Sequence, residues 1–102
     1  MKKMNDLDIL IEEATIDAYG EDEQRSGFLV IMKENICTPF SAMIAGSPIE
    51  VTKFDMDHRR LFVHCRREGK TYSVDVLDIE PIEGTQGVDW ISAYRQWCQG
   101  VV

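Results

Sequence analysis

The apolar residues in the first part of the chain recur at the spacing of an α-helix. Residues 5–18 place apolar side chains on one stripe and acidic side chains on the opposite side. The stripe consists of Leu7, Leu10, Ile11, Ala14 and Ala18. We expect a helix here, ended by Gly20 in a left-handed conformation, because glycine adopts that conformation readily at a helix C-terminus.

Residues 21–36 predict a second helix, which begins with three acidic residues at the positive end of its dipole. Gly27 lies in the middle of this pattern, where glycine costs about 1 kcal/mol. We therefore expect a close contact with another element at Gly27. The run 28–32 is apolar on every side and also fits a buried strand. We favour helix because Glu34 and Asn35 prolong the polar pattern before Pro39.

From Phe40 the apolar period changes to two, which indicates strands. Two strands are predicted about a turn at 46–48, followed by a polar connection over 54–58. A hairpin follows, with Leu61, Val63 and Cys65 on one face and its turn at 67–70. A short strand falls within 77–82, where Pro81 ends it.

Residues 88–99 predict a final helix with Trp90, Ile91, Tyr94, Trp97 and Cys98 on one face. We interpret its two tryptophans as core residues rather than a ligand cage. The whole pattern predicts a single α+β domain over 1–102. It has two N-terminal helices, a small antiparallel curled sheet or partial barrel of four to five short strands, and one C-terminal helix.

Charge is distributed unevenly along the 102 residues, whose formal net charge is −7. Residues 1–24 sum to −6, residues 58–70 to +4, and residues 75–89 hold five acids and no base. This balance disfavours nucleic acid and anionic membranes as partners and favours cations or basic proteins. No stretch is long and apolar enough to span a membrane, and no signal peptide is evident, so we expect a cytoplasmic protein with reduced cysteines.

Catalytic motifs are sparse. His64 and Cys65 are neighbours on a predicted strand, so their side chains face opposite sides. Ser73, Asp75 and His64 form a conceivable nucleophile trio, but small polar residues on the solvent side of a hairpin give the same pattern, and we prefer that interpretation. Zinc-ligand spacing and phosphate-binding loops are absent. We expect a protein that is not an enzyme.

Calcium is the ligand that the acidic residues favour, because Ca²⁺ takes six to eight oxygen ligands. Asp55 and Asp57 have the first two spacings of an EF-hand loop, but Arg59 stands at the third position and no glycine follows. We therefore predict a site outside any EF-hand, assembled from separate segments. Its candidate ligands are Glu34, Asp55, Asp57, Asp78, Glu80 and Glu83.

Several segments together resemble the bacterial calcium-binding protein family first described in cyanobacteria. The matching stretches are Ile16-Asp17-Ala18-Tyr19-Gly20-Glu21-Asp22-Glu23, then Gly27, Glu34-Asn35, Pro39-Phe40, residues 77–82, Asp89-Trp90 and Trp97. The resemblance implies a small acidic α+β protein that binds calcium through carboxylates.

This sequence departs from the family's pattern at Lys33, at the tight turn 46–48, and at Arg59 and Arg60 beside one predicted loop. Bases next to a cation site weaken it by like-charge repulsion. An alternative function therefore stays open: a non-catalytic interaction module that keeps the family fold, has a weakened ion site, and binds a protein partner or a second copy of itself.

Overall fold

The three predicted helices are present, and the largest difference in their boundaries is at the end of the first helix. A computed structural model describes residues 6–100, in which the α-helices are α1 (Asp6–Ala14), α2 (Glu21–Asn35) and α3 (Asp89–Gly100). The ambiguous run 28–32 is helical, as expected. Residue 5, the predicted start of the first helix, lies outside the described residues. Within residues 6–100 no helix combines the length and apolarity that crossing a membrane requires.

The end of α1 corrects the prediction at Gly20. The helix stops at Ala14, and Thr15 closes its last turn by donating its hydroxyl to the Ile11 carbonyl at 2.7 Å. The left-handed residue is Asp17, with φ 61°, whereas Gly20 is extended and flanks the start of α2. Aspartate tolerates the left-handed conformation better than most residues, so the turn does not need glycine.

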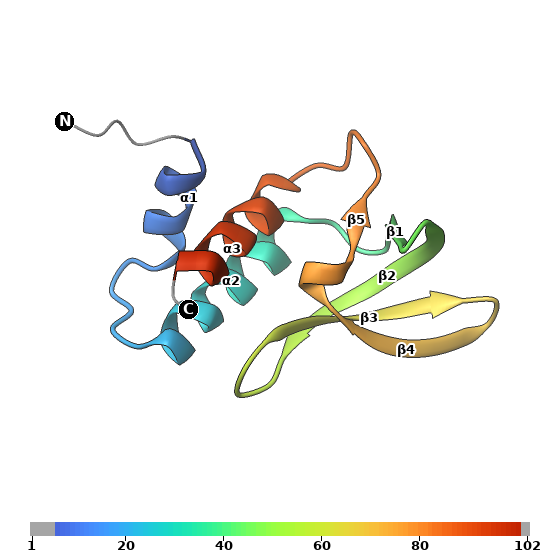
Figure 1. Ribbon diagram of the computed structural model, residues 1–102, viewed down its shortest axis with the longest axis horizontal. Helices are drawn as coiled ribbons and strands as arrows, with labels where there is room; N and C mark the ends of the chain where they lie inside the picture. The colour runs from blue at the N-terminus through green and yellow to red at the C-terminus, as the bar shows by residue number, and fades with distance from the viewer. Residues whose placement is uncertain (1–5, 101–102) are drawn as a thin grey trace.

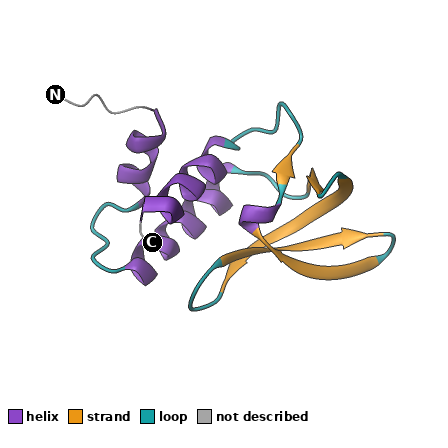
Figure 2. Cartoon of the chain, viewed as in Figure 1, coloured by secondary structure: helices purple, strands orange, loops and turns teal. Residues whose placement is uncertain are grey.

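The strands form one open antiparallel sheet of five strands in the order β4-β3-β2-β1-β5 (Figures 1 and 2). The strands are β1 (Phe40–Ile44), β2 (Ser47–Met56), β3 (Leu61–Arg67), β4 (Lys70–Asp75) and β5 (Glu80–Pro81). A short 3₁₀ helix, η1 (Val76–Asp78), connects the last two strands. This arrangement confirms the α+β class and the antiparallel sheet, which is not closed into a barrel.

The predicted polar connection over 54–58 is wrong at residues 54–56, because β2 continues to Met56, and only residues 57 and 58 lie in the connection. The register between β2 and β3 shifts between Val51 and Lys53, which marks a β-bulge at Thr52. One extra residue reverses the alternation of faces beyond it. Val51 and Phe54, three positions apart, are therefore both buried, and Asp55 lies on the outer face.

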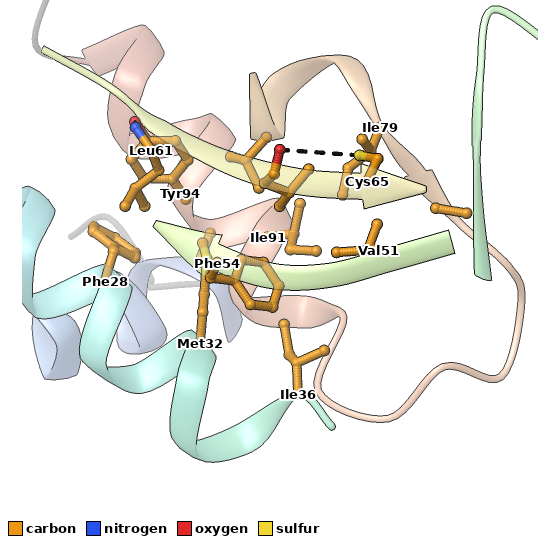
Figure 3. Close-up of a cluster of buried hydrophobic side chains, with 14 of the residues drawn as sticks. Phe28, Met32, Ile36, Val51, Phe54, Leu61, Cys65, Ile79, Ile91 and Tyr94 are labelled. Atoms are coloured by element: carbon orange, nitrogen blue, oxygen red, sulfur yellow. Dashed lines mark hydrogen bonds between the residues drawn. The ribbon is translucent and has the colours of Figure 1, made fainter. Parts of the chain in front are cut away.

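The core lies between the sheet and the helices α2 and α3 (Figure 3). Phe28 of α2 is fully buried, with ring centroids 5.4 Å from Tyr94 and 5.6 Å from Trp97 of α3. Edge-to-face and tilted aromatic pairs of this kind add about 0.5–1.5 kcal/mol each beyond the burial of their surface. Trp97 is therefore a core residue, as predicted.

Gly27 provides the close contact that its position predicts. A Cβ atom at this residue would collide with the backbone carbonyl of Ala14 at the end of α1. The missing side chain thus lets α2 approach α1 directly. The conformational cost of a glycine in mid-helix is offset by this packing.

A buried cation adds to the contact between α2 and α3. Arg25 is 8% exposed, its guanidinium lies 5.4 Å from the ring centre of Trp97, and it pairs with Asp22 at 3.4 Å. The Trp97 indole donates to the Gln24 side chain at 2.8 Å. These polar contacts orient α3. Its residues Tyr94 and Arg95 form hydrogen bonds with the backbone of Leu61 and of residues 77 and 79, next to the two acidic segments described below.

Candidate functional site

The first acidic segment is the loop from β2 to β3, where Asp57 is engaged by its own backbone. One carboxylate oxygen accepts the N–H groups of Arg59 at 2.9 Å and Arg60 at 3.1 Å. The other lies 3.5 Å from the Arg60 guanidinium. The Arg59 N–H donor, followed by the contacts of Arg60, lowers the pKa of Asp57 below its usual 3.8. This carboxylate is charged and already has donors on both oxygens.

Asp55 is engaged in the same way, at the end of β2. Its Oδ1 accepts the Met56 N–H at 2.8 Å, and its Oδ2 lies 3.1 Å from Nε2 of His64 on β3. The hydrogen bond with His64 is the main cause that lowers the pKa of Asp55, and the Met56 N–H adds to it. A cation at Asp55 or Asp57 would have to compete with these donors and with the Arg60 guanidinium.

The side chains around His64 differ from the trio that the sequence makes conceivable, because the acid beside His64 is Asp55. Ser73 Oγ lies 3.5 Å from His64 Nδ1, and Asp55 takes the place expected for Asp75. Asp75 instead caps η1 by accepting the Leu77 N–H at 2.9 Å. The side chains of His64 and Asp55 are 40% and 37% exposed. Water therefore solvates the trio and weakens the electrostatic assistance that catalysis needs.

Cys65 is fully buried on the opposite face of β3, so the expectation that His64 and Cys65 point apart is confirmed. Burial raises the pKa of the Cys65 thiol. A protonated, inaccessible thiol is a poor nucleophile and a poor metal ligand. Cys65 is therefore a core residue.

The second acidic segment covers residues 78–83, and its carboxylates are free. Asp78 ends η1, Glu80 lies in β5, and Glu83 follows in the next loop; all three are exposed. Their side chains make no hydrogen bond or ion pair with any residue in 6–100. Arg95 contacts this segment only through the backbone, donating to the carbonyls of Leu77 at 3.3 Å and Ile79 at 2.5 Å.

Glu34 is the remaining predicted ligand. It is exposed in the last turn of α2, and it too has no partner among the described side chains. The loop after β5 lies against this end of α2, because a Cβ atom at Gly87 would collide with the Asn35 carbonyl. The loop that follows the segment 78–83 therefore packs against the end of α2, where the negative end of the helix dipole attracts cations.

The six predicted ligands thus fall into two places rather than one. Asp55, at the end of β2, and Asp57, in the loop that follows, lie together, whereas Glu34 lies in the last turn of α2 and the segment 78–83 runs from η1 through β5 into the next loop. Within residues 6–100 no three His, Cys, Asp or Glu side chains gather closely enough to hold a metal ion. A metal site on either segment would need backbone carbonyls, water or local rearrangement to complete it. The ligand set stays a prediction.

His64 and Arg60 were not predicted as the partners of Asp55 and Asp57. Asp57 and Arg60 are three residues apart, a spacing that the sequence does show. The pairing of Asp55 with His64 had no such signal, because it depends on the register of β2 against β3 beyond the bulge.

No protein-family model and no curated protein sequence matches this chain. Two solved structures do. The crystal structure of Anabaena CcbP superposes with a TM-score of 0.79 over 96% of this chain and 93% of that chain, at 19% sequence identity. The chain has the fold of Anabaena CcbP. A calcium binding protein in the calcium-binding form gives a TM-score of 0.69 over 96% of this chain and 95% of that chain, also at 19% identity. The similarity therefore spans the whole CcbP fold, and at this identity it shows the fold alone.

Proposed function

We propose that this protein binds calcium at the surface formed by residues 78–83 and the end of α2 at Glu34. The observation that carries the proposal is the set of free, exposed carboxylates there, on a fold shared with a calcium binding protein in the calcium-binding form. Within residues 6–100, these four side chains have no hydrogen-bond donors of the kind that engage Asp55 and Asp57. Ca²⁺ accepts carboxylate, carbonyl and water oxygens in a flexible geometry, so a surface site of this kind suits it.

The expected affinity is low. The acids come from separate segments, and water would supply several ligands. Calcium sites with few charged ligands and little rigidity have Kd values of about 10⁻⁴–10⁻³ M. Magnesium should bind more weakly still, because it demands a regular octahedron and gives up its water reluctantly.

Backbone NMR of the wild-type protein, titrated separately with Ca²⁺ and Mg²⁺, locates the site. We expect saturable Ca²⁺ shifts at residues 78–84 and 33–36, and smaller shifts with Mg²⁺. Shifts centred on residues 55–60 would place calcium in the loop between β2 and β3 and overturn the proposed location. No chemical-shift change at millimolar Ca²⁺ would overturn calcium binding itself.

Two matched variants separate ligand loss from loss of net charge, with affinity measured by calorimetry. The triple variant Asp78→Asn/Glu80→Gln/Glu83→Gln should weaken Ca²⁺ binding at least tenfold. The control Glu12→Gln/Glu13→Gln/Asp17→Asn removes the same number of charges from the other end of the chain and should change affinity by less than about twofold, because salt screens distant charges. Asp57→Asn should also leave the affinity unchanged. Equal losses in both triple variants would mean that calcium responds to net charge and has no site at 78–83.

A further inference from the structure

The two edges of the sheet are built differently. The edge strand β5 consists of two residues, Glu80 and Pro81. A short strand, a charge and a proline each keep a sheet edge from pairing with another chain. The opposite edge strand, β4, runs for six residues without proline, glycine or a register shift against β3, and its middle residues 71–74 carry no charge. The β4 edge therefore lacks the protection that β5 has.

The turn between β3 and β4 determines which backbone groups of β4 point away from the sheet. Glu68 and Gly69 form a two-residue loop, and both have a positive φ, 51° and 78°, as a type I′ turn requires. The residues that flank such a loop, Arg67 and Lys70, exchange both of their backbone hydrogen bonds, and hydrogen-bonded pairs alternate from there along the ladder. The N–H and C=O groups that point away from β3 are therefore those of Thr71, Ser73 and Asp75.

These outward groups have no strand partner within residues 6–100. β4 pairs only with β3 and lies at the lower right margin of the molecule in Figure 1. Tyr72 lies opposite the buried Cys65 on the core face of the sheet, yet it is 38% exposed because no strand lies beyond it. The edge thus presents unpaired backbone groups together with an incompletely covered aromatic side chain.

We propose that two copies of the protein pair along β4, antiparallel and about a two-fold axis at Ser73, so that their sheets join into one. In this register Ser73 faces its own copy, and Thr71 faces Asp75 of the second copy. No other centre gives all three outward residues a partner inside the strand, because shifting the axis by one residue places one of them opposite the turn or η1. The contact is isologous, so the assembly closes as a dimer.

A second copy is the occupant because β4 complements itself in this register. Tyr72 lies opposite Val74 on both sides of the axis, and an aromatic residue opposite a β-branched residue is a favourable cross-strand pair. Thr71 lies opposite Asp75, which uses one carboxylate oxygen to cap η1 and has the other available for the threonine hydroxyl. The register brings no like charges face to face.

The dimer is expected to be weak and to strengthen with salt. One pair of strands buries less area than the about 1,200 Å² of a stable interface. Each copy carries a net charge of −7, so the copies repel one another, whereas the contact itself consists of hydrogen bonds and apolar packing. Raising the salt to about 500 mM shortens the Debye length to under about 5 Å and should increase the dimer fraction.

Sedimentation velocity in calcium-free buffer containing EDTA tests the proposal independently of calcium binding. At about 150 mM salt the weight-average sedimentation coefficient of the wild type should rise towards that of a dimer, and not beyond it, as the concentration approaches about 1 mM. A wild type that stays monomeric at this concentration would overturn the proposal and leave the edge to an extended segment of a different protein.

Charges placed at residue 73 test the two-fold axis. Ser73→Lys and Ser73→Asp each bring two like charges face to face and should stay monomeric, whereas an equimolar mixture should dimerise, because lysine then faces aspartate. Val30→Lys and Val30→Asp, at a 52% exposed position in the middle of α2, make the same changes in net charge and should associate as the wild type does. A mixture of the Ser73 variants that stays monomeric, or single Ser73 variants that match the wild type, would exclude this register.

Disulfide trapping measures the register directly. In a Cys37→Ser background, which removes the exposed thiol, Ser73→Cys places two cysteines opposite one another. Hydrogen-bonded antiparallel pairs have Cα atoms about 5.5 Å apart, within the range of a disulfide. Diamide, which accepts the two electrons and two protons of the thiol pair, should cross-link this variant at least tenfold faster than Thr71→Cys. Equal rates would overturn the two-fold axis at Ser73.

Discussion

Two acidic segments of this molecule look equivalent in the sequence and differ in the fold. In the loop from β2 to β3, the carboxylates of Asp55 and Asp57 already accept hydrogen bonds from the protein. In the segment 78–83, the carboxylates are exposed to solvent and have no hydrogen-bond or ion-pair partner among residues 6–100. The difference shows that a run of acids predicts attraction for cations only where the fold leaves those acids without donors of its own.

The two segments are nevertheless anchored to the same helix by consecutive residues. Tyr94 of α3 accepts the N–H of Leu61 at 3.3 Å, where the first loop ends. Arg95 donates to the carbonyls of Leu77 and Ile79 in the second segment. Burial raises the pKa of Tyr94 to about 12, so its hydroxyl stays protonated at neutral pH. Each anchor offers a way to disturb one segment without the other.

The largest expected effect is that of Tyr94→Phe. The change leaves the buried Leu61 N–H without its acceptor and should cost about 1–3 kcal/mol of unfolding free energy. Urea denaturation measures the loss. Tyr19→Phe, at an exposed site, should change stability by less than about 0.5 kcal/mol. Equal stability of Tyr94→Phe and the wild type would show that this hydrogen bond does not hold the loop.

Arg95→Met should have a smaller and local effect. It keeps much of the aliphatic stem and removes the donors to two backbone carbonyls, a loss of about 1 kcal/mol. Amide hydrogen exchange should accelerate at residues 77–81 and stay unchanged at 57–61, whereas Tyr94→Phe should give the reverse pattern. If both variants accelerate exchange equally in both segments, the two segments open as one unit. The proposal that each anchor stabilises its own segment would then be wrong.

The smallest effect concerns pH. Because hydrogen bonds lower the folded-state pKa of Asp55 and Asp57, their contribution to stability is fully present above the unfolded value of 3.8 and is lost as pH falls through the lower folded values. Carboxyl NMR titration should give midpoints below 3.8 for both residues. His64→Asn should raise the midpoint of Asp55 and leave that of Asp57 in place. A midpoint of Asp55 that does not move would exclude His64 as the main cause.

Much of the fold could be predicted because its signals are local. The helical stripe before Ala14, the apolar face of α3 and the alternation of Leu61, Val63 and Cys65 each depend on residues close together in the chain. Gly27 was also informative, since a glycine in mid-helix implies a neighbour close to the backbone. The predicted end of the first helix was wrong because Asp17, rather than Gly20, adopts the left-handed turn.

The helices, most strands, the apolar core positions and the uneven charge can be read from the sequence alone, because they follow from the periodicity and composition of short segments. The role of each acid depends on contacts between segments that are distant in the chain. The bulge at Thr52 turns Asp55 to the outer face beside His64, while Glu34, Asp78, Glu80 and Glu83 have no partner among residues 6–100. A carboxylate's affinity for a cation depends on the donors and charges that surround it in space, and strand register and element packing determine those neighbours.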